Sequence, residues 1–147
     1  FILKTMNINK GSITFCEKFN IEEITDKRGS LSYLEFGNGL SFPVKRNYFL
    51  YSIGQNETRG HHAHKILQQV IICLSGSCNI TLYDGKSSKE IFLSSPTSAL
   101  YICPMIWRVM SGFSKNAIFS VLASEIYDES DYIRDIKEFE MIQREYT

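Results

Sequence analysis

All three histidines of this chain lie within four residues, in the segment RGHHAHK from Arg59 to Lys65. An imidazole has a pKa of about 6.5, so it can take or give a proton near neutral pH. If the segment is a strand, alternate side chains share a face, so that His62 and His64 point one way and His61 points the other. The spacing therefore predicts two imidazoles in one pocket, flanked by the cations Arg59 and Lys65.

A metal site and a surface cluster without function are the alternatives for this histidine pair. Metal sites built on an H-x-H strand usually add a glutamate and a later histidine, whereas this chain has Gln68 and Gln69 and no histidine after His64. Ligand count and the neighbouring cations argue against a metal. Three histidines between an arginine and a lysine also argue against an idle surface cluster. We therefore favour proton transfer on an anionic ligand.

The composition limits the classes of function. The 147 residues are 44% hydrophobic and 22% charged, which predicts one globular domain spanning residues 1–147. A formal net charge of +0 argues against nonspecific nucleic-acid binding, and no apolar run is long enough to span a membrane. The four cysteines form no C-x-x-C pair, and Cys73, which lies in an apolar run, is predicted to be a buried thiol in a reducing compartment, the cytoplasm by default.

Short strands with turns between them account for most of the chain. Strands are predicted at 31–36, 48–53, 69–74, 78–83, 90–93, 98–102, 106–110 and 117–123. Ser75-Gly76-Ser77 predicts a hairpin, and Tyr83-Asp84-Gly85-Lys86 predicts a type I′ turn. This pattern is typical of a small sandwich or barrel. Residues 128–146 instead predict an amphipathic helix, or two short ones, capped at Asp128 or Ser130 and covering the core.

Several motifs spread over most of the chain belong together. They are Asp26 to Leu31, P-x-K-R-x-Y ending at Tyr48, RGHHAHK, Gln69 to Gly76, Leu100-Tyr101 with Pro104 and Trp107, and two segments between Val121 and Ile133. In this combination the chain resembles the cupin-type dTDP-4-keto-6-deoxyglucose 3,4-ketoisomerases, which include FdtA, QdtA and WxcM-like domains. It departs from them at three positions. His61 stands where the family often has an aromatic or small residue, and Gln68 replaces a common Glu. Arg108 stands where we expect His.

The resemblance implies an all-β, cupin-like double-stranded β-helix (jelly-roll) barrel with a short C-terminal helical tail. It also implies an isomerase that moves a ketone from C4 to C3 through an enediol, with no metal and no redox cofactor. Two histidines on one strand face suit this chemistry. We expect His62 to handle the carbon-bound proton, and His64 and Tyr48 to assist the transfer between the two oxygens.

The same resemblance suggests residues that hold the dTDP-linked keto-sugar. Arg46 and Arg59 are expected to bind phosphate or the enediolate, because a guanidinium matches phosphate oxygens in pairs, and Lys65 adds charge. Arg28-Gly29, in a loop expected near the pocket, resembles the members that form the galactose-configured product. Trp107 either lines the pocket against the nucleobase or packs in the core.

Family members are dimers, often with an exchanged N-terminal strand, which residues 8–19 could supply here. Their product is usually aminated and then acylated for a surface polysaccharide or glycoprotein, such as lipopolysaccharide O-antigen or an S-layer glycan. Two alternatives stay open from the residues: a non-catalytic nucleotide-sugar-binding cupin, and an enzyme like the dTDP-sugar 3,5-epimerases. The paired H-x-H fits ketoisomerisation better than either.

Overall fold

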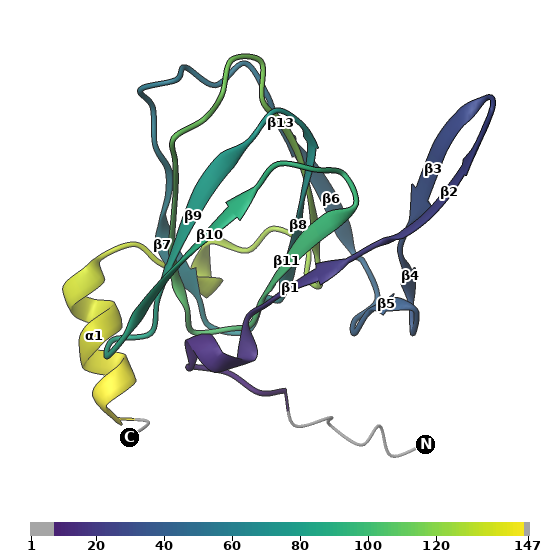
Figure 1. Cartoon of the computed structure of the whole chain (residues 1–147). Helices are drawn as coiled ribbons and strands as arrows, with labels where there is room; N and C mark the ends of the chain where they lie inside the picture. Colours follow the sequence, from purple (N-terminus) through teal and green to yellow (C-terminus); the bar gives the residue numbers. More distant parts are fainter. Residues whose placement is uncertain (1–7, 146–147) are drawn as a thin grey trace, which may run out of the picture.

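The computed structural model describes residues 8–145, which form two five-stranded antiparallel sheets facing each other (Figure 1). The first sheet has the order β1 (Glu17–Asn20), β11 (Ser98–Ile102), β8 (Gln69–Ser75), β13 (Ile118–Ala123), β6 (Arg46–Leu50). The second has the order β10 (Ser88–Leu93), β9 (Cys78–Tyr83), β12 (Trp107–Ser111), β7 (Arg59–His64), β14 (Tyr132–Ile133). Most strands that pair within a sheet are far apart in sequence. The predicted all-β jelly-roll class is confirmed.

The main core lies between the two sheets. Strand β9 shows why, because its buried and half-buried residues alternate, as expected when one face of a strand packs inward. Ile80 and Leu82 of this strand are fully buried, and they join Leu100 of β11 and Phe119 of β13 in one hydrophobic cluster. The four cysteines are free and buried, as the sequence predicted for Cys73.

The predicted hairpin at Ser75-Gly76-Ser77 is wrong. Strands β8 and β9 begin and end close to the predicted bounds, but they belong to different sheets and do not pair. The segment therefore crosses from one sheet to the other. Gly76 has φ +76, and a Cβ there would lie 2.9 Å from the Cα of Ala117, so glycine is required by both backbone conformation and close approach.

A true hairpin does join β9 to β10 through Asp84-Gly85. Ser88 pairs with Tyr83, which leaves a loop of residues 84–87. The predicted type I′ turn is wrong, because that turn needs positive φ at both central residues and only Gly85 of this loop has it. Asp84 supports the loop instead, since its Oδ1 accepts hydrogen bonds from the backbone N–H groups of Lys86 and Ser87.

The C-terminal tail contains two short helices, as one of the predicted alternatives required. Asp128 caps the 3₁₀ helix η2 (Glu129–Asp131), and after β14 the helix α1 (Ile136–Glu145) follows. The Oδ1 of Asp135 accepts hydrogen bonds from the first turn of α1. Phe139 packs against Trp107 and Ile133, so the apolar stripe covers core as predicted, although Ile136 stays exposed. Tyr146, the predicted end, lies outside the described residues.

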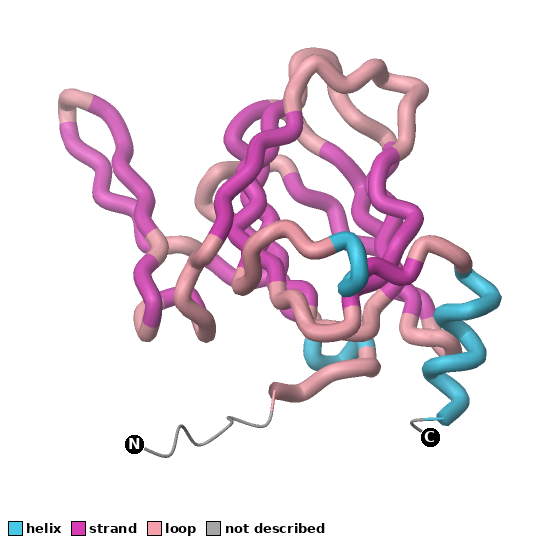
Figure 2. Tube along the Cα trace, turned by 180° about the vertical axis from the view of Figure 1, so that it is seen from behind, coloured by secondary structure: helices cyan, strands magenta, loops and turns pink. Residues whose placement is uncertain are grey.

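One hairpin stands away from the barrel (Figures 1 and 2). It is formed by β2 (Glu22–Asp26) and β3 (Gly29–Tyr33), every residue of which is exposed except half-buried Tyr33. The short pair β4 (Glu35–Phe36) and β5 (Gly39–Leu40) follows, so the strand predicted at 31–36 is divided in two. The 3₁₀ helix η1 (Ile13–Phe15) precedes β1. Among residues 8–145, no helix has the length and apolarity to cross a membrane.

Candidate active site

The histidine segment forms β7, and a bulge in this strand aims its side chains. Arg108 pairs with His62 and Val109 with Gly60, so His61 is an extra residue without a partner on β12. Gly60 and His61 both have positive φ, +93 and +56. A Cβ on Gly60 would lie 2.7 Å from the backbone oxygen of Arg108, which explains why glycine precedes the histidines.

His62 and His64 lie on the same face, as the sequence predicted. Their ring centroids are 4.8 Å apart in an edge-to-face arrangement, and both rings pack against Tyr132 of β14. His61 points elsewhere and is exposed, with Nε2 2.8 Å from the hydroxyl of Thr58. The paired strand face therefore carries two imidazoles in contact, and His61 is not one of them.

The hydrogen bonds of the two rings determine where their protons lie. The Nδ1 of His62 is 2.9 Å from the backbone oxygen of Gly60, and the Nδ1 of His64 is 3.0 Å from Oδ2 of Asp131. A carbonyl and a carboxylate can only accept, so each Nδ1 carries a hydrogen when its ring is neutral. Each Nε2 then holds a lone pair, and that of His64 is buried without a protein partner.

Both rings are held in the neutral form. Burial, followed by the nearby charge of Arg108, lowers the pKa of His62 to about 4. The same two causes, with further contributions from His62, Arg46 and Arg134, lower the pKa of His64. The cations that contribute are Arg108, Arg134 and, for His64, Arg46, and they differ from the predicted flanks Arg59 and Lys65. The arrangement supplies two uncharged bases at neutral pH.

Tyr48 is the third predicted catalytic residue, and it belongs to a buried polar chain next to the histidines. Arg108 donates to the amide oxygen of Gln69, whose Nε2 lies 2.9 Å from the Tyr48 hydroxyl. Burial raises the pKa of Tyr48, so its phenol stays protonated at neutral pH. Since the Tyr48 oxygen already accepts from Gln69, its hydrogen is free to be donated to a bound oxygen.

Arg108 and Arg46 are two positively charged side chains of this region whose hydrogen bonds within residues 8–145 go to no carboxylate. Arg108 is 3% exposed, and its hydrogen bonds go to the neutral oxygens of Ile106 and Gln69. Arg46 lies 5.3 Å from the ring centroid of Tyr48 and 5.7 Å from that of Tyr127, and its Nε and Nη2 are buried without a hydrogen-bond partner. Donors left unpaired in this way suit an anionic ligand.

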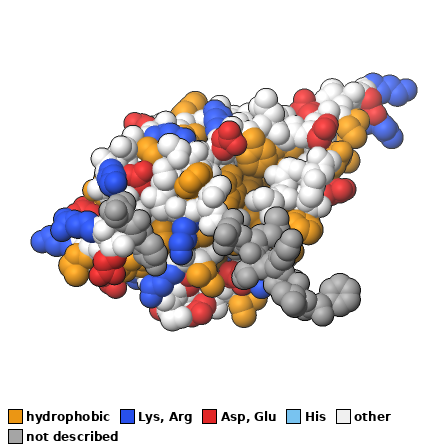
Figure 3. Space-filling model, turned by 90° about the horizontal axis from the view of Figure 1, so that it is seen from below, with side chains coloured by type: hydrophobic (Ala, Val, Ile, Leu, Met, Phe, Trp, Pro, Cys, Tyr) orange, Lys and Arg blue, Asp and Glu red, His pale blue; other side chains and the backbone are white. Residues whose placement is uncertain are grey.

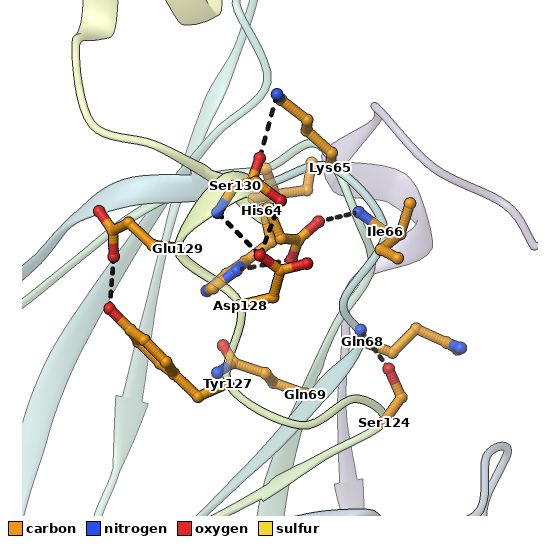
Figure 4. A network of polar contacts seen from close by, with 12 residues as sticks. His64, Lys65, Ile66, Gln68, Gln69, Ser124, Tyr127, Asp128, Glu129 and Ser130 are labelled. Carbon is orange, nitrogen blue, oxygen red and sulfur yellow. Dashed lines mark hydrogen bonds and ion pairs between the residues drawn. The ribbon is translucent and has the colours of Figure 1, made fainter.

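Within the described part of the chain, the remaining predicted site residues make no hydrogen bond or ring contact with the two imidazoles. Trp107, one of whose predicted places was the pocket, packs in the core with its ring centroid 5.8 Å from that of Phe139. Arg28 and Gly29 lie at the tip of the projecting hairpin, where Arg28 pairs with Asp26, so the expected position near the pocket is wrong for a single chain. Arg59 and Lys65 are exposed, and Lys65 donates to the backbone oxygen of Ser130 (Figure 4).

Several residues of the site were not singled out as such from the sequence: Gln69, Asp131, Tyr132 and Arg134. Gln69, Asp131 and Tyr132 lie within motifs that carried the family resemblance, whereas Arg134 lies just after the last of them, and no periodicity connects these residues with β7. Figure 4 shows the segment of Asp128 and Ser130 lying against His64 and Lys65. Within residues 8–145, no group of three or more His, Cys, Asp or Glu side chains is arranged to hold a metal ion.

A jelly-roll barrel with two neutral histidines, a tyrosine and buried arginines in one site defines a cupin-like protein equipped for acid–base chemistry. The chain matches the family described as "FdtA: WxcM-like, C-terminal" over residues 13–144. It therefore belongs to this family.

Three relatives illustrate the likeness. A curated TDP-4-oxo-6-deoxy-alpha-D-glucose-3,4-oxoisomerase from Aneurinibacillus thermoaerophilus is 45% identical over 82% of this chain and 86% of its own length. The sugar 3,4-ketoisomerase QdtA from Thermoanaerobacterium thermosaccharolyticum, solved with TDP, is 38% identical with TM-score 0.86, covering 89% and 96% of the two chains. WlaRB, a TDP-quinovose 3,4-ketoisomerase from Campylobacter jejuni, is 45% identical with TM-score 0.83, covering 86% and 97%.

Proposed function

We propose that this protein is a sugar-nucleotide 3,4-ketoisomerase that moves the keto group of dTDP-4-keto-6-deoxyglucose from C4 to C3. The observation that carries the proposal is the pair of neutral imidazoles, 4.8 Å apart, whose Nδ1 atoms both face protein acceptors. A ketone shift needs bases that are uncharged at neutral pH and reach adjacent positions of one substrate. Relatives of this chain are named for the same reaction.

His62 is proposed to begin the reaction. Its Nε2 takes the acidic proton at C3, the electrons of that C–H bond form a C3–C4 double bond, and the C4 oxygen becomes an enediolate oxygen. Return of a proton to C4 and loss of the proton from the C3 hydroxyl then give the 3-ketone. No electron acceptor is needed, because the substrate is oxidised at C3 and reduced at C4 in the same molecule.

His64 and Tyr48 are proposed to move the proton between the two oxygens. The lone pair on Nε2 of His64 can accept the C3 hydroxyl proton, and the Tyr48 hydroxyl can donate to the C4 oxygen. The buried cation Arg108, held by Gln69 and Ile106, stabilises the negative charge that develops on the enediolate.

The pyrophosphate of the substrate is proposed to bind at Arg46, whose buried Nε and Nη2 lack partners. Arg59, which begins the histidine strand, and Lys65, which directly follows it, are exposed cations that supply further attraction for an anion. Arg46→Lys keeps the charge but loses the paired geometry, so it should raise KM for the dTDP-sugar more than it lowers kcat.

The decisive experiment is incubation with dTDP-4-keto-6-deoxyglucose together with a 3-aminotransferase that consumes the 3-keto product. We expect an aminated sugar that forms only when this protein is present. Binding of the dTDP-sugar without turnover would support the alternative of a nucleotide-sugar-binding cupin. A product epimerised at C3 or C5 but still carrying the 4-ketone would support the epimerase alternative.

The proposed chemistry uses protein side chains alone. Full activity after exhaustive chelation is the expected result, and restoration of lost activity by an added metal would contradict it. We also propose the galactose configuration at C4 of the product, on the resemblance of Arg28-Gly29 to the galactose-forming members. NMR of the reduced product would distinguish this from the glucose configuration.

A homodimer with exchanged N-terminal segments is proposed as the assembly. Ile24 and Leu31 face each other across the projecting hairpin and are 58% and 57% exposed. A two-stranded hairpin with apolar exposed side chains is marginal by itself, and Figure 3 shows hydrophobic side chains in the hollow between it and the barrel. Light scattering should give about twice the chain mass of 16.9 kDa, and a monomeric mass would refute the dimer.

The product of this reaction is a 3-keto sugar nucleotide, which is chemically ready for amination. We propose that the protein works in the cytoplasm, where a 3-aminotransferase and then an acyltransferase complete a sugar for a surface polysaccharide or glycoprotein. Deletion of the gene should remove the N-acylated deoxysugar from the surface glycans, and glycans of unchanged composition would contradict this role.

A further inference from the structure

We propose that Asp131 is a positioning residue whose carboxylate holds His64 in the tautomer with its lone pair on Nε2. The inference deepens the proposed ketoisomerase function and rests on it for the kinetic part only. It assigns a role to a side chain that lies 67 residues from His64 in sequence.

The contact is buried and directional. The Nδ1 of His64 lies 3.0 Å from Oδ2 of Asp131, and the two side chains are 0% and 8% exposed. On the other side of the same ring, Nε2 is buried and has no hydrogen-bond partner in the described protein. A buried ring nitrogen without a partner costs free energy unless a ligand satisfies it, so Nε2 is the atom available to substrate.

The position of Asp131 is fixed independently of its contact with the imidazole. Its other oxygen, Oδ1, accepts a hydrogen bond of 2.8 Å from the backbone N–H of Ile66. Its backbone oxygen accepts from the N–H of Lys65, and the next residue, Tyr132, pairs with His64 across β14 and β7. The backbone of Asp131 is therefore fixed to Lys65 and the carboxylate to Ile66, and the carboxylate cannot rotate away from His64 without breaking its bond to Ile66.

This contact is a hydrogen bond to a neutral ring. Burial and the surrounding groups Arg108, His62, Arg46 and Arg134 lower the pKa of His64, so the imidazole carries one proton at neutral pH. A neutral ring has two tautomers, and the partner of one nitrogen selects between them. A carboxylate accepts only, so Asp131 places the proton on Nδ1 and leaves Nε2 as the base.

Asp131→Asn tests the assignment because both carboxylate oxygens are in use. An asparagine has one acceptor, and the backbone N–H of Ile66 can only donate, so the amide oxygen must stay on that side. The amide NH₂ then faces Nδ1 of His64 and favours the tautomer with hydrogen on Nε2. We expect kcat to fall about 10²- to 10⁴-fold, with little change in KM.

Asp128→Asn is the matched control. Asp128 lies three residues earlier on the same 3₁₀ turn, but only its Oδ1 accepts hydrogen bonds, from the backbone N–H and hydroxyl of Ser130. An asparagine oxygen can accept both, so this variant should keep kcat, KM and the His64 tautomer of the unmodified protein. A similar loss of kcat in both variants would indicate a general effect on the turn and would overturn the positioning role.

The direct readout is ¹⁵N NMR of the histidine rings at neutral pH, which distinguishes the Nδ1–H and Nε2–H tautomers. We expect Nδ1–H for His64 in the unmodified protein and Nε2–H in Asp131→Asn. Finding Nε2–H or a charged ring in the unmodified protein overturns the proposal, even if the variant fails to fold. If the protein does not turn over the keto-sugar, the proposed function fails, whereas the tautomer result still decides the role of Asp131.

Discussion

Strand β7 and the β2–β3 hairpin are both antiparallel structures, but they differ greatly in how many other elements of the chain they contact. β7 lies between β12 and β14, and its histidines contact side chains from several other elements. β2 and β3 pair with each other and, among residues 8–145, with no other strand. The difference indicates that the geometry of the site is set by contacts inside one chain, whereas the hairpin has few such contacts and is the surface on which the proposed dimer depends.

The largest effect is expected at the two histidines of β7. His62→Asn and His64→Asn should each lower kcat about 10²- to 10⁴-fold, because each removes a proton-transfer group and leaves a side chain of similar size. Turnover in the coupled assay and exchange of the C3 proton with deuterated water measure this. His61→Asn is the control, since that ring is exposed, and near-normal turnover in both test variants would refute the assignment.

The next largest effect is expected at the bulge of β7. Gly60→Ala should lower the free energy of unfolding by about 2 kcal/mol or more, because the new Cβ would meet the Arg108 oxygen and φ is +93. Chemical denaturation measures the change. Gly37→Ala is the control, since Gly37 has φ +87 but no atom within 4 Å of an added Cβ. Equal losses in the two variants would show that the close approach to β12 has no effect.

The pH dependence tests whether the buried site holds neutral bases. With the pKa of His62 lowered to about 4, kcat/KM should stay level between about pH 6 and 8 and fall on the acid side near pH 4. If kcat/KM instead falls near pH 6.5, the ordinary pKa of imidazole, then burial and Arg108 do not lower the pKa of His62 as described.

The same lowered pKa makes a prediction for stability. The unfolded imidazole binds a proton below about pH 6.5, whereas folded His62 does so only near pH 4. The unfolded state is therefore favoured as pH falls through this window, and the stability contributed by neutral His62 is lost there. Denaturation curves between pH 7 and 4 should show less of this loss in His62→Asn.

The smallest effect within one chain is expected at the hairpin. Ile24→Ala together with Leu31→Ala should change the unfolding free energy of the monomeric barrel by about 0.5 kcal/mol or less, because both side chains are mostly exposed. Leu82→Ala, in the fully buried core, should cost about 2–5 kcal/mol. The double variant should weaken the proposed dimer, measured by light scattering at dilution, and a dimer of unchanged strength would contradict an interface at the hairpin.

Local patterns were sufficient to predict most strands and the common face of the histidine pair. The turn residues on either side predicted β9, whose bounds agree with the structure, and the alternation of side chains along a strand placed His62 and His64 together. Gly76 and Gly85 were predicted to lie between strands, and both have positive φ there, although the types of connection differ from those predicted. These features depend on backbone sterics of a few consecutive residues, so the sequence contains them directly.

Pairing between distant segments could not be predicted in this way. The turn at Gly76 has the composition of a hairpin, but it crosses between sheets because β8 pairs with β11 and β13 instead of β9. Trp107 looked equally suited to pocket and core, and the packing of Phe139 from α1 places it in the core. The flanking cations Arg59 and Lys65 are near the histidines in sequence, yet burial, followed by the charge of Arg108 from β12, has the largest effect in lowering the histidine pKa values.

The sequence by itself determined that two imidazoles share one face of a strand that contains a glycine just before them, because the alternation of side chains along a strand depends only on neighbouring residues. Only the tertiary structure decided what those imidazoles can do. The pairing of β14 with β7 brings Asp131 to Nδ1 of His64, and the pairing of β12 with β7 brings a buried Arg108 beside both rings. Burial, charge and hydrogen-bond direction come from residues far apart in the chain, and these together determine the protonation state on which the proposed chemistry depends.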